Sequence, residues 1–380
     1  MRVLIAGGGT GGHVIPALAI ARELRDTHGA EVRFAGTARG LETRLVPEAG
    51  FSLELVRSGQ LKNVSLATRA RTLVDLPLGV LECVRLIRGF RPEVVVGVGG
   101  YASGPGMLAA LLLRVPTLAF EPNAVPGFTN RLVGRWVSAA AVNFEETRRY
   151  FRNGRVTGVP VRQEFFAIAE RDRAASDEGG GSLRTLPLTE RPAARVRLLV
   201  SGGSQGARVF NAVMPKIAKA LLDYVPGLEI LHQAGARSGE ATAEAYRSSG
   251  ADAARWEVRE FLDDMPRRFA EADLILCRSG ASTVAELAAA GRAAVLVPFP
   301  GAADDHQVKN AEILAGAGAA ELRRQEPDDS LMGGFLLSDL SALLLNPDRR
   351  AEMGRRVRGF AHPDAGSAIA ALVLGLADRV

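Results

Sequence analysis

Short apolar runs alternate along the chain with longer stretches in which apolar residues recur every three or four positions. The runs predict β-strands, at residues 2–6, 31–35, 94–98, 115–120, 138–142, 196–200, 228–231, 273–276 and 293–297. The helical stretches cover residues 16–27, 41–49, 66–89, 106–113, 284–290 and 307–316. Alternation of this kind is typical of parallel sheets with helical crossovers, so the pattern predicts an α/β protein.

The start of this pattern occurs twice. Residues 3–6 lead into Gly7-Gly8-Gly9-Thr10-Gly11-Gly12, and residues 198–200 lead into Ser201-Gly202-Gly203-Ser204-Gln205-Gly206. Each is a strand, a glycine-rich turn and the start of a helix, as in a doubly wound domain. We therefore expect two Rossmann-like domains, residues 1–160 and 161–361. Residues 171–195, rich in Gly, Ser and Pro, predict a flexible loop between the two glycine-rich turns.

Composition excludes several classes of protein. Of the 380 residues, 47% are hydrophobic and 23% are charged, which excludes wholly disordered, collagenous and disulfide-scaffold chains. Only two cysteines occur, without a CxxC pair, which argues against a cysteine metal site and fits a reducing compartment. The chain runs directly into its first strand, so no signal peptide is expected. The uncharged stretch 94–113 is rich in glycine, which predicts strand, loop and helix rather than a membrane span.

Positive charge is concentrated in the first part of the chain. Residues 1–160 carry a net charge of +8 and the remainder −3, which sum to the +5 of the whole. This asymmetry fits an anionic partner such as a membrane surface, a phosphate ligand or nucleic acid, and equally a general bias toward arginine. Within residues 57–91, apolar and basic side chains share a helical pattern: Leu73, Leu76, Val80, Val84 and Ile87 with Arg85, Arg88 and Arg91. The pattern fits either a membrane-facing surface or a crossover helix packed on its own sheet.

The first glycine-rich turn has the spacing of an anion-binding loop. Gly7, Gly9 and Gly12 satisfy G-x-G-x-x-G between a strand and a helix. A nicotinamide dinucleotide is disfavoured, because the second strand ends at Gly36 rather than at an acidic residue. His13 follows directly and is either a general base or a structural histidine.

The second glycine-rich turn has two interpretations. Residues 202–206 fit G-x-S-x-G, and Asp304, Asp305 and His306 follow in the order of a serine hydrolase with Ser204 as the nucleophile. The same glycines and serine also suit a phosphate-binding loop.

Three further loops follow predicted strands, where α/β proteins bind ligands. In 279–286, Ser282 or Thr283 is expected to cap a helix, and Glu286 fits either a ribose contact or a charge that stabilises the helix start. Residues 298–310 and 121–127 are the other two. A D-x-D triplet, H-E-x-x-H and a Cys/His cluster are absent from the sequence, so a bound diphosphate would be neutralised by helix amides and arginine rather than by a metal.

Together these motifs resemble the bacterial peptidoglycan N-acetylglucosaminyltransferases of the MurG type. The matching stretches run in the family's order over almost the whole chain: residues 7–13, 99–101, 123–127 with Thr129 and Asn130, 158–162, 202–207 with Asn211, 278–286, and 304–307 with Asn310. The resemblance implies two Rossmann-like domains that face each other across a cleft (GT-B fold). It also implies transfer of GlcNAc from UDP-GlcNAc, with inversion, to the muramoyl 4-hydroxyl of undecaprenyl-diphospho-MurNAc-pentapeptide (lipid I to lipid II). No cofactor is expected.

The resemblance assigns roles to particular residues. The second domain would bind the donor, and the first would face the acceptor and the membrane, with the helix at about 362–380 packing back onto it. His13 is the candidate base. The implied donor contacts are Thr10, Gly11, Gly12, Asn123, Arg162, Ser204, Leu262, Ala281, Ser282, Thr283, Val284, Ala285, Glu286 and Gln307.

The lipid-linked acceptor favours the membrane interpretation of residues 57–91, at Leu73, Leu76, Val80, Arg85, Arg88 and Arg91. The implied location is the cytoplasmic face of the bacterial membrane, with no nucleic-acid partner and with other cell-wall enzymes as neighbours. Pro122, Gly301 and the long 176–194 linker depart from the family pattern. A serine hydrolase and a non-catalytic nucleotide-sugar sensor remain the alternatives.

Overall fold

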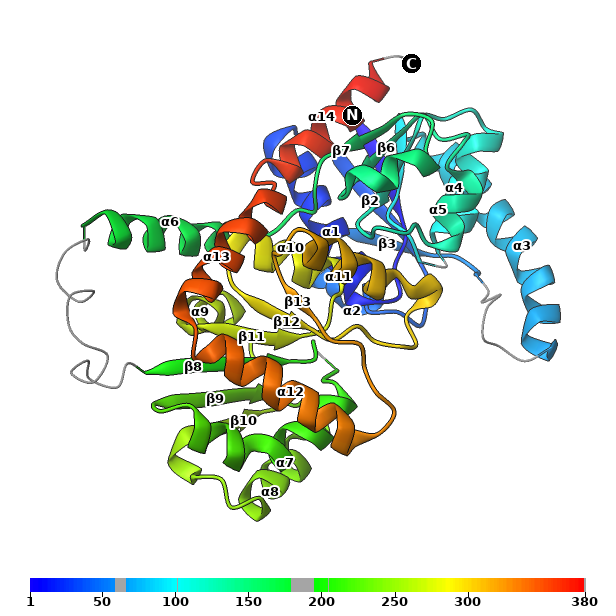
Figure 1. The fold of residues 1–380 in the computed structure, drawn as a ribbon. Coiled ribbons are helices and arrows are strands. Elements are labelled where there is room, and N and C mark those ends of the chain that lie inside the picture. Colours follow the sequence, from blue (N-terminus) through cyan, green and yellow to red (C-terminus); the bar gives the residue numbers. More distant parts are fainter. Residues whose placement is uncertain (59–65, 101, 179–194, 204, 379–380) are drawn as a thin grey trace. The chain divides into compact units, whose positions relative to one another are not determined.

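The chain forms two compact units (Figure 1). Unit 1 comprises Met1–Val161 and His362–Val380, and unit 2 comprises Arg162–Ala361. The computed structural model describes residues 1–58, 66–100, 102–178, 195–203 and 205–378, with the backbone alone for 66–74 and 173–178.

Unit 1 is built on a seven-stranded parallel sheet. Its strands lie in the order β3-β2-β1-β4-β5-β6-β7. They are β1 (Arg2–Ala6), β2 (Glu31–Gly36), β3 (Ser52–Leu55), β4 (Val94–Gly97), β5 (Thr117–Glu121), β6 (Ala139–Val142) and β7 (Gly154–Val156). Every residue of β4, β5 and β6 is buried. Such continuous burial explains why these strands are apolar runs rather than alternating patterns.

Helices connect the strands of unit 1, and one helix comes from the end of the chain. They are α1 (Gly11–Arg22) with its π-helical extension η1 (Glu23–Thr27), α2 (Glu42–Glu48), α3 (Leu66–Phe90), α4 (Ser103–Leu112), α5 (Phe128–Val133), η2 (Glu145–Tyr150) and α14 (Ala365–Ala377). Helix α14 packs against α1 and the strands β4 to β6. Its buried side chains include Ile369, Ala370 and Val373, so the C-terminal segment completes the core of unit 1.

Unit 2 repeats the same plan with six parallel strands. Their order is β10-β9-β8-β11-β12-β13, which matches the first six positions of the unit 1 sheet. The strands are β8 (Val196–Ser201), β9 (Leu228–Gln233), β10 (Trp256–Arg259), β11 (Leu274–Cys277), β12 (Ala294–Leu296) and β13 (Glu321–Leu322). The predicted pair of doubly wound domains is therefore confirmed.

The helices of unit 2 cover both faces of its sheet. They are α6 (Gln163–Glu178), α7 (Arg208–Tyr224), α8 (Gly239–Ser248), η3 (Ala253–Arg255), α9 (Met265–Glu271), α10 (Ala281–Ala290), η4 (Ala303–Asp305), α11 (His306–Gly316), α12 (Asp329–Leu344), α13 (Pro347–Val357) and η5 (Arg358–Phe360). Helices α7 and α12 pack together (Figure 1). Phe210, Val213 and Leu336 are fully buried and contribute to the core there.

Four strands of the structure escaped the sequence prediction, and all four are edge strands. They are β3 and β7 of one sheet and β10 and β13 of the other. Their residues are mostly half-buried or exposed, because a strand at the edge is covered incompletely. They therefore lack the apolar run that identifies a central strand.

Some predicted helix and loop boundaries were wrong. Helices α1, α4 and α10 begin three to five residues before the predicted positions 16, 106 and 284, directly after glycine-rich turns. The loop predicted from residue 171 is helical at first, since α6 continues to Glu178. Residues 179–194 of that loop lie outside the described part of the chain.

One helical stretch, Pro347–Ala377, is long and apolar enough to cross a membrane by length and composition, with 28% of its most apolar window buried. The backbone divides this stretch, because η5 ends at Phe360 and α14 begins at Ala365. Helix α14 alone has 13 residues, fewer than the roughly 20 that span a bilayer. Its buried side faces the unit 1 sheet.

Candidate functional site

Each unit presents its glycine-rich turn where the strand order reverses. In unit 1 this point lies between β1 and β4, and in unit 2 between β8 and β11. The loops after these strands contain residues 7–10, 98–102, 202–207 and 278–280. The carboxyl ends of strands at such a point form the usual ligand site of a doubly wound domain. The structure thus brings the predicted loops together in pairs, within each unit.

The turn after β1 is a close-packed glycine loop. Gly9 has φ of 95°, and a Cβ on Gly8 would lie 2.3 Å from Cδ of Glu42. A Cβ on Gly100 would lie 2.3 Å from the carbonyl oxygen of Gly8. A larger residue at Gly8 would therefore displace the Glu42 carboxylate, and one at Gly100 would displace the backbone of the turn at Gly8.

Glu42 supports this loop and is a residue that the sequence analysis missed. Its carboxylate is only 1% exposed and accepts the N–H of Gly9 at 2.7 Å. It also accepts the N–H of Thr37 at 3.0 Å and the hydroxyl of Thr37 at 2.9 Å. Glu42 therefore holds the loop in place, and the Gly9 N–H is engaged by its carboxylate.

The candidate base lies at the start of α1. Thr10 is the N-cap residue without a side-chain cap bond, and Thr10 and Gly12 are exposed. The half-buried ring of His13 lies over Gly99, where a Cβ would come within 2.9 Å of its Cε1 atom. His13 thus lies between the loops that follow β1 and β4, in the first turn of α1, where its own N–H donates to the carbonyl of Thr10 at 3.1 Å.

A buried carboxyl shapes the loop that contains Asn123. Glu121, 2% exposed, accepts the backbone and side-chain N–H groups of Asn123 at 3.0 and 3.1 Å. It also accepts the N–H of Gly127 and the side-chain amide of Asn130, each at 3.0 Å. Burial raises the pKa of Glu121, while these donors oppose the rise. The loop position of Asn123 therefore depends on Glu121.

The turn after β8 is equally close-packed. A Cβ on Gly206 would lie 1.9 Å from the carbonyl oxygen of Ala234, so this position requires glycine, which also has φ of 71°. Ser204 itself lies outside the described residues. Leu262, one of the implied donor contacts, is buried, with 4% of its surface exposed.

The start of α10 contains six of the fourteen predicted donor contacts, residues 281–286. Its N-cap is Gly280 with no side-chain cap bond, so the expected capping by Ser282 or Thr283 is wrong. Instead, the buried Oγ of Ser282 has no hydrogen-bond partner among the described residues. Ala281, Val284 and Ala285 are buried and pack the helix, whereas Thr283 is half-buried.

Glu286 lies one turn inside α10 and has an unusual acidity. Burial raises its pKa to about 7, and the positive charge of Arg162 opposes this rise. The Arg162 guanidinium is exposed and lies over the ring of Phe165, 5.2 Å from the centroid. The carboxyl of Glu286 and the guanidinium of Arg162 are thus near enough to interact electrostatically in unit 2. Their separation in the sequence gave no indication of this proximity.

Hydrogen bonds fix the position of Gln307 and engage the oxygen of its side chain. Its Oε1 accepts the N–H of Phe299 at 3.0 Å, and its backbone carbonyl accepts the hydroxyl of Ser279 at 2.8 Å. The buried Asn310 donates to the carbonyl of Ser279 at 3.1 Å. Because its oxygen is engaged with Phe299, Gln307 has its amide N–H groups to offer a ligand.

The geometry disfavours the serine hydrolase. Nδ1 of His306 lies 2.7 Å from the carbonyl oxygen of Ala303, so it donates to backbone rather than to the carboxylate that a triad requires. Helix α7 begins only at Arg208, four residues beyond Ser204, whereas a nucleophile elbow passes directly from strand to helix.

The residues predicted to face a membrane lie on α3, except Arg91, which directly follows the last residue of the helix, Phe90. Arg85, Arg88 and Arg91 are exposed. Leu76 and Val80 are half-buried, and Val80 packs against the core of unit 1. The side chain of Leu73 lies outside the described residues.

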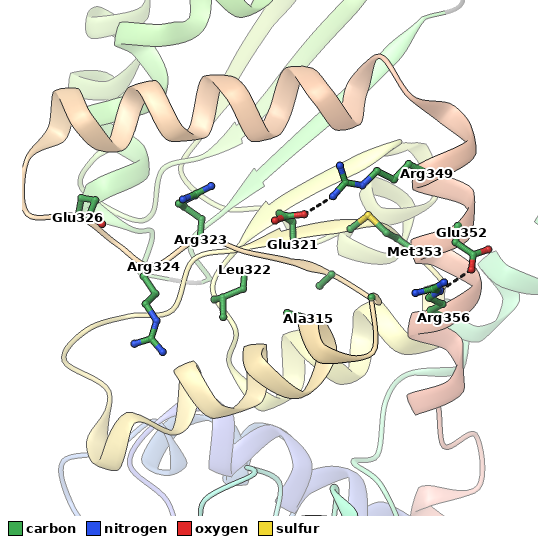
Figure 2. Close-up of a pocket in the computed structure, with 12 residues that line it drawn as sticks. Ala315, Glu321, Leu322, Arg323, Arg324, Glu326, Arg349, Glu352, Met353 and Arg356 are labelled. Carbon is green, nitrogen blue, oxygen red and sulfur yellow. Dashed lines mark hydrogen bonds and ion pairs between the residues drawn. The ribbon is translucent and has the colours of Figure 1, made fainter.

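A separate hollow of about 710 Å³ lies on unit 2 beside β13 and α13 (Figure 2). Its arginines are engaged in ion pairs, including Arg349 with Glu321 at 2.8 Å and Arg356 with Glu352 at 2.7 Å. It contains none of the predicted site residues. Among the described residues there is also no cluster of three His, Cys, Asp or Glu that could hold a metal ion.

Comparison with known proteins identifies the family. Residues 3–142 match the glycosyltransferase family 28 N-terminal domain, and residues 197–369 match the glycosyltransferase family 28 C-terminal domain. A UDP-N-acetylglucosamine–N-acetylmuramyl-(pentapeptide) pyrophosphoryl-undecaprenol N-acetylglucosamine transferase of Anaeromyxobacter sp. (strain Fw109-5) is 42% identical over 382 residues, covering 100% of this chain and 94% of the relative. The Stutzerimonas stutzeri (strain A1501) protein of the same name is 41% identical, covering 99% and 98%.

A solved structure gives the same answer. The crystal structure of Acinetobacter baumannii MurG is 33% identical, with a TM-score of 0.78, and the match covers 98% of this chain and 99% of that one. The chain therefore belongs to the MurG family of N-acetylglucosaminyltransferases, within glycosyltransferase family 28.

Proposed function

We propose that this protein transfers N-acetylglucosamine from UDP-GlcNAc to the N-acetylmuramyl-pentapeptide that is linked through pyrophosphate to undecaprenol. The observation that carries this proposal is the start of α10, in a chain that matches the family along its whole length. There Glu286, with a pKa of about 7, lies beside Arg162 and one turn from the hydroxyl of Ser282, which has no hydrogen-bond partner in the described part of the chain. A carboxylate can accept both hydroxyls of a ribose, while helix amides and arginine neutralise a diphosphate.

Unit 2 is proposed to bind the donor. Arg162, Ser204 and the first amides of α10 contact the diphosphate, Glu286 the ribose, and the backbone of Leu262 the uracil. Gln307 donates its amide N–H groups to the sugar, since its oxygen is held by Phe299. These contacts develop their full strength as negative charge forms on the departing UDP, which is how they promote the reaction.

Unit 1 is proposed to contribute the acceptor side. His13 takes the proton of the muramoyl 4-hydroxyl as that oxygen attacks the anomeric carbon, with inversion, and UDP leaves. Thr10, Gly11 and Gly12 at the start of α1, together with Asn123, contact the reacting groups. The role of Glu121 is to keep the Asn123 loop in shape.

Unit 1 is also proposed to rest on the cytoplasmic face of the membrane, where its lipid-linked acceptor lies. Beside the basic residues of α3, the packed helices α3, α4 and α5 expose apolar side chains. Leu81 is 52% exposed, Leu112 71% and Leu132 47%, and Trp136 after α5 is 66% exposed. Apolar side chains among arginines suit a surface of anionic lipid.

The test is UDP release from UDP-GlcNAc in excess EDTA, with and without a short-chain analogue of the lipid-linked acceptor. We expect release that depends on the acceptor, survives EDTA, and falls at least about a hundredfold in Glu286→Ala, because buried hydrogen bonds to the ribose are lost. Glu146→Ala, at an exposed position of unit 1, is the control. Donor binding without release in the presence of acceptor would instead support a nucleotide-sugar sensor.

A further inference from the structure

Two consecutive buried polar residues end strand β9 without an evident part in binding or chemistry. His232 is 0% exposed and Gln233 is 2% exposed. Successive side chains of a strand point to opposite faces of the sheet. The pair therefore reaches both sides of the unit 2 sheet from one point, next to the strand that carries the second glycine-rich turn.

His232 belongs to a chain of hydrogen bonds with a fixed direction. Its Nε2 lies 3.1 Å from Oδ1 of Asn211, and its Nδ1 lies 3.1 Å from the hydroxyl of Tyr246. A carboxamide oxygen only accepts, so Nε2 carries the proton and Nδ1 accepts from the tyrosine. Burial lowers the pKa of His232 to about 3, which keeps the ring neutral, as this arrangement requires.

This chain of hydrogen bonds ends at the turn that follows β9. Nδ2 of Asn211 donates to the carbonyl oxygen of Ala234 at 2.9 Å. That oxygen is the atom that a Cβ on Gly206 would meet at 1.9 Å, and a Cβ on Gly235 would meet the carbonyl of Gln205 at 2.3 Å. The turn at Ala234 and Gly235 is therefore in backbone contact with the glycine-rich turn after β8.

Gln233 reaches the same glycine-rich turn from the other face. Its Oε1 accepts the hydroxyl of Ser201 at 2.8 Å, and Ser201 Oγ accepts the N–H of Gly203 at 3.4 Å. The beginning of the turn is thus linked to Gln233, and its end, at Gly206, abuts the Ala234 carbonyl that Asn211 holds.

The turn after β9 is also tied to the loop of the proposed uracil contact. The N–H of Ala234 donates to the carbonyl of Arg259 at 2.8 Å, and the N–H of Gly235 donates to that of Glu260 at 3.1 Å. Leu262 follows two residues later. The turn at Ala234 and Gly235 therefore contacts both the segment proposed to bind the diphosphate and the segment proposed to bind the uracil.

We infer that His232 and Gln233, together with Asn211 and Tyr246, are positioning residues that hold the glycine-rich turn after β8 in the shape that receives the donor diphosphate. This inference rests on the proposed donor site in unit 2. A backbone shaped before the ligand arrives costs less free energy to order on binding, so loosening it weakens donor affinity.

Tyr246→Phe and Gln233→Met test the inference. Tyr246→Phe keeps the ring that stacks on Trp256, with centroids 5.0 Å apart. It removes the hydroxyl that donates a hydrogen bond to Nδ1 of His232. Gln233→Met keeps the length of the side chain and removes its bond to Ser201. Leu336→Val is the matched control, because it disturbs the core of the same unit on α12, outside these bonds. For each protein we measure Kd for UDP, KM and kcat with UDP-GlcNAc, the free energy of unfolding, and hydrogen exchange of the ligand-free peptide 202–207.

Both variants are expected to exchange faster at 202–207 and to raise Kd for UDP and KM about threefold to tenfold, with kcat nearly unchanged. Leu336→Val should lose stability without any of these changes. Variants that lose stability while Kd, KM and exchange at 202–207 stay as in the wild type would overturn the inference. If the wild-type protein does not bind UDP, the proposed donor site itself is refuted, whatever the exchange rate at 202–207. Failure of the inference and failure of the donor site are therefore distinguishable.

Discussion

At the residue scale, the site depends on buried polar groups that hold loops. Glu42 fixes the first glycine-rich turn through Gly9, and Glu121 fixes the Asn123 loop through four donors. The sequence left Glu286 as either a ribose contact or a helix-start charge until the family resemblance assigned it to the donor site, whereas Glu42 was not singled out from the sequence. The sequence does not show that Glu42 meets Gly9, because they are 33 residues apart and meet only once the sheet has formed.

Glu286 predicts a pH dependence of donor binding. Its pKa, raised from 4.5 to about 7 by burial, leaves the carboxyl only partly ionised at neutral pH. KM for UDP-GlcNAc should therefore fall as pH rises from 6 to 8, as the carboxylate that is proposed to bind the ribose forms. The same shift makes Glu286 lower the stability as pH rises from about 4.5 through about 7, because the unfolded chain ionises first.

Glu286→Gln is the direct test of this assignment, followed by steady-state kinetics across that pH range. The variant should have a raised KM with the pH dependence through pH 7 removed, while Glu146→Gln, at an exposed site, keeps the wild-type profile. A wild-type KM that stays constant between pH 6 and 8 would contradict the role of this carboxyl.

At the element scale, burial decides which elements the sequence reveals. The central strands are apolar runs because both of their faces are covered, and nine were predicted close to their observed bounds. The edge strands β3, β7, β10 and β13 have half-exposed residues and show no such run. Helix starts were placed too late because glycine-rich turns lead directly into α1 and α10, where local propensity favours a turn.

Helix α14 predicts a specific loss of stability. Ile369 is 0% exposed in the core of unit 1, so Ile369→Ala should lower the free energy of unfolding by about 2–5 kcal/mol, through lost burial and the cavity left behind. Ala371→Ser, on the exposed side of the same helix, should change it little. Equilibrium urea denaturation measures both. An equal stability of the two variants would mean that the last helix adds nothing to the core of unit 1.

At the scale of the molecule, two units of the same strand order carry unequal charge. Residues 1–160 hold the excess of +8, and its exposed part includes Arg85 and Arg88 on α3 and Arg91 directly after it. The structure changes the apolar partners of these arginines, since Val80 packs inward and Leu81 is exposed instead. A basic and apolar surface remains, but it is drawn from several helices rather than from one helical face.

Charge reversal of Arg85, Arg88 and Arg91 to Glu should weaken binding to anionic vesicles. Each basic residue near such a surface contributes about 1 kcal/mol, so removing three lowers the partition coefficient about a hundredfold or more at low salt. The same reversal at Arg324, Arg349 and Arg355, exposed on unit 2, is the control. Vesicle sedimentation gives the result, and unchanged binding of the unit 1 variant would refute the membrane face.

The sequence by itself determined the two doubly wound domains, the glycine-rich turns and the family, because apolar periodicity and glycine positions are local signals that each element carries. Only the tertiary structure decided which polar groups meet. Arg162 comes near Glu286, His232 links Asn211 to Tyr246, and Val80 turns inward. These outcomes depend on the order in which parallel strands pair. Residues distant in the chain become neighbours only when that order brings their strand ends to the same edge of a sheet.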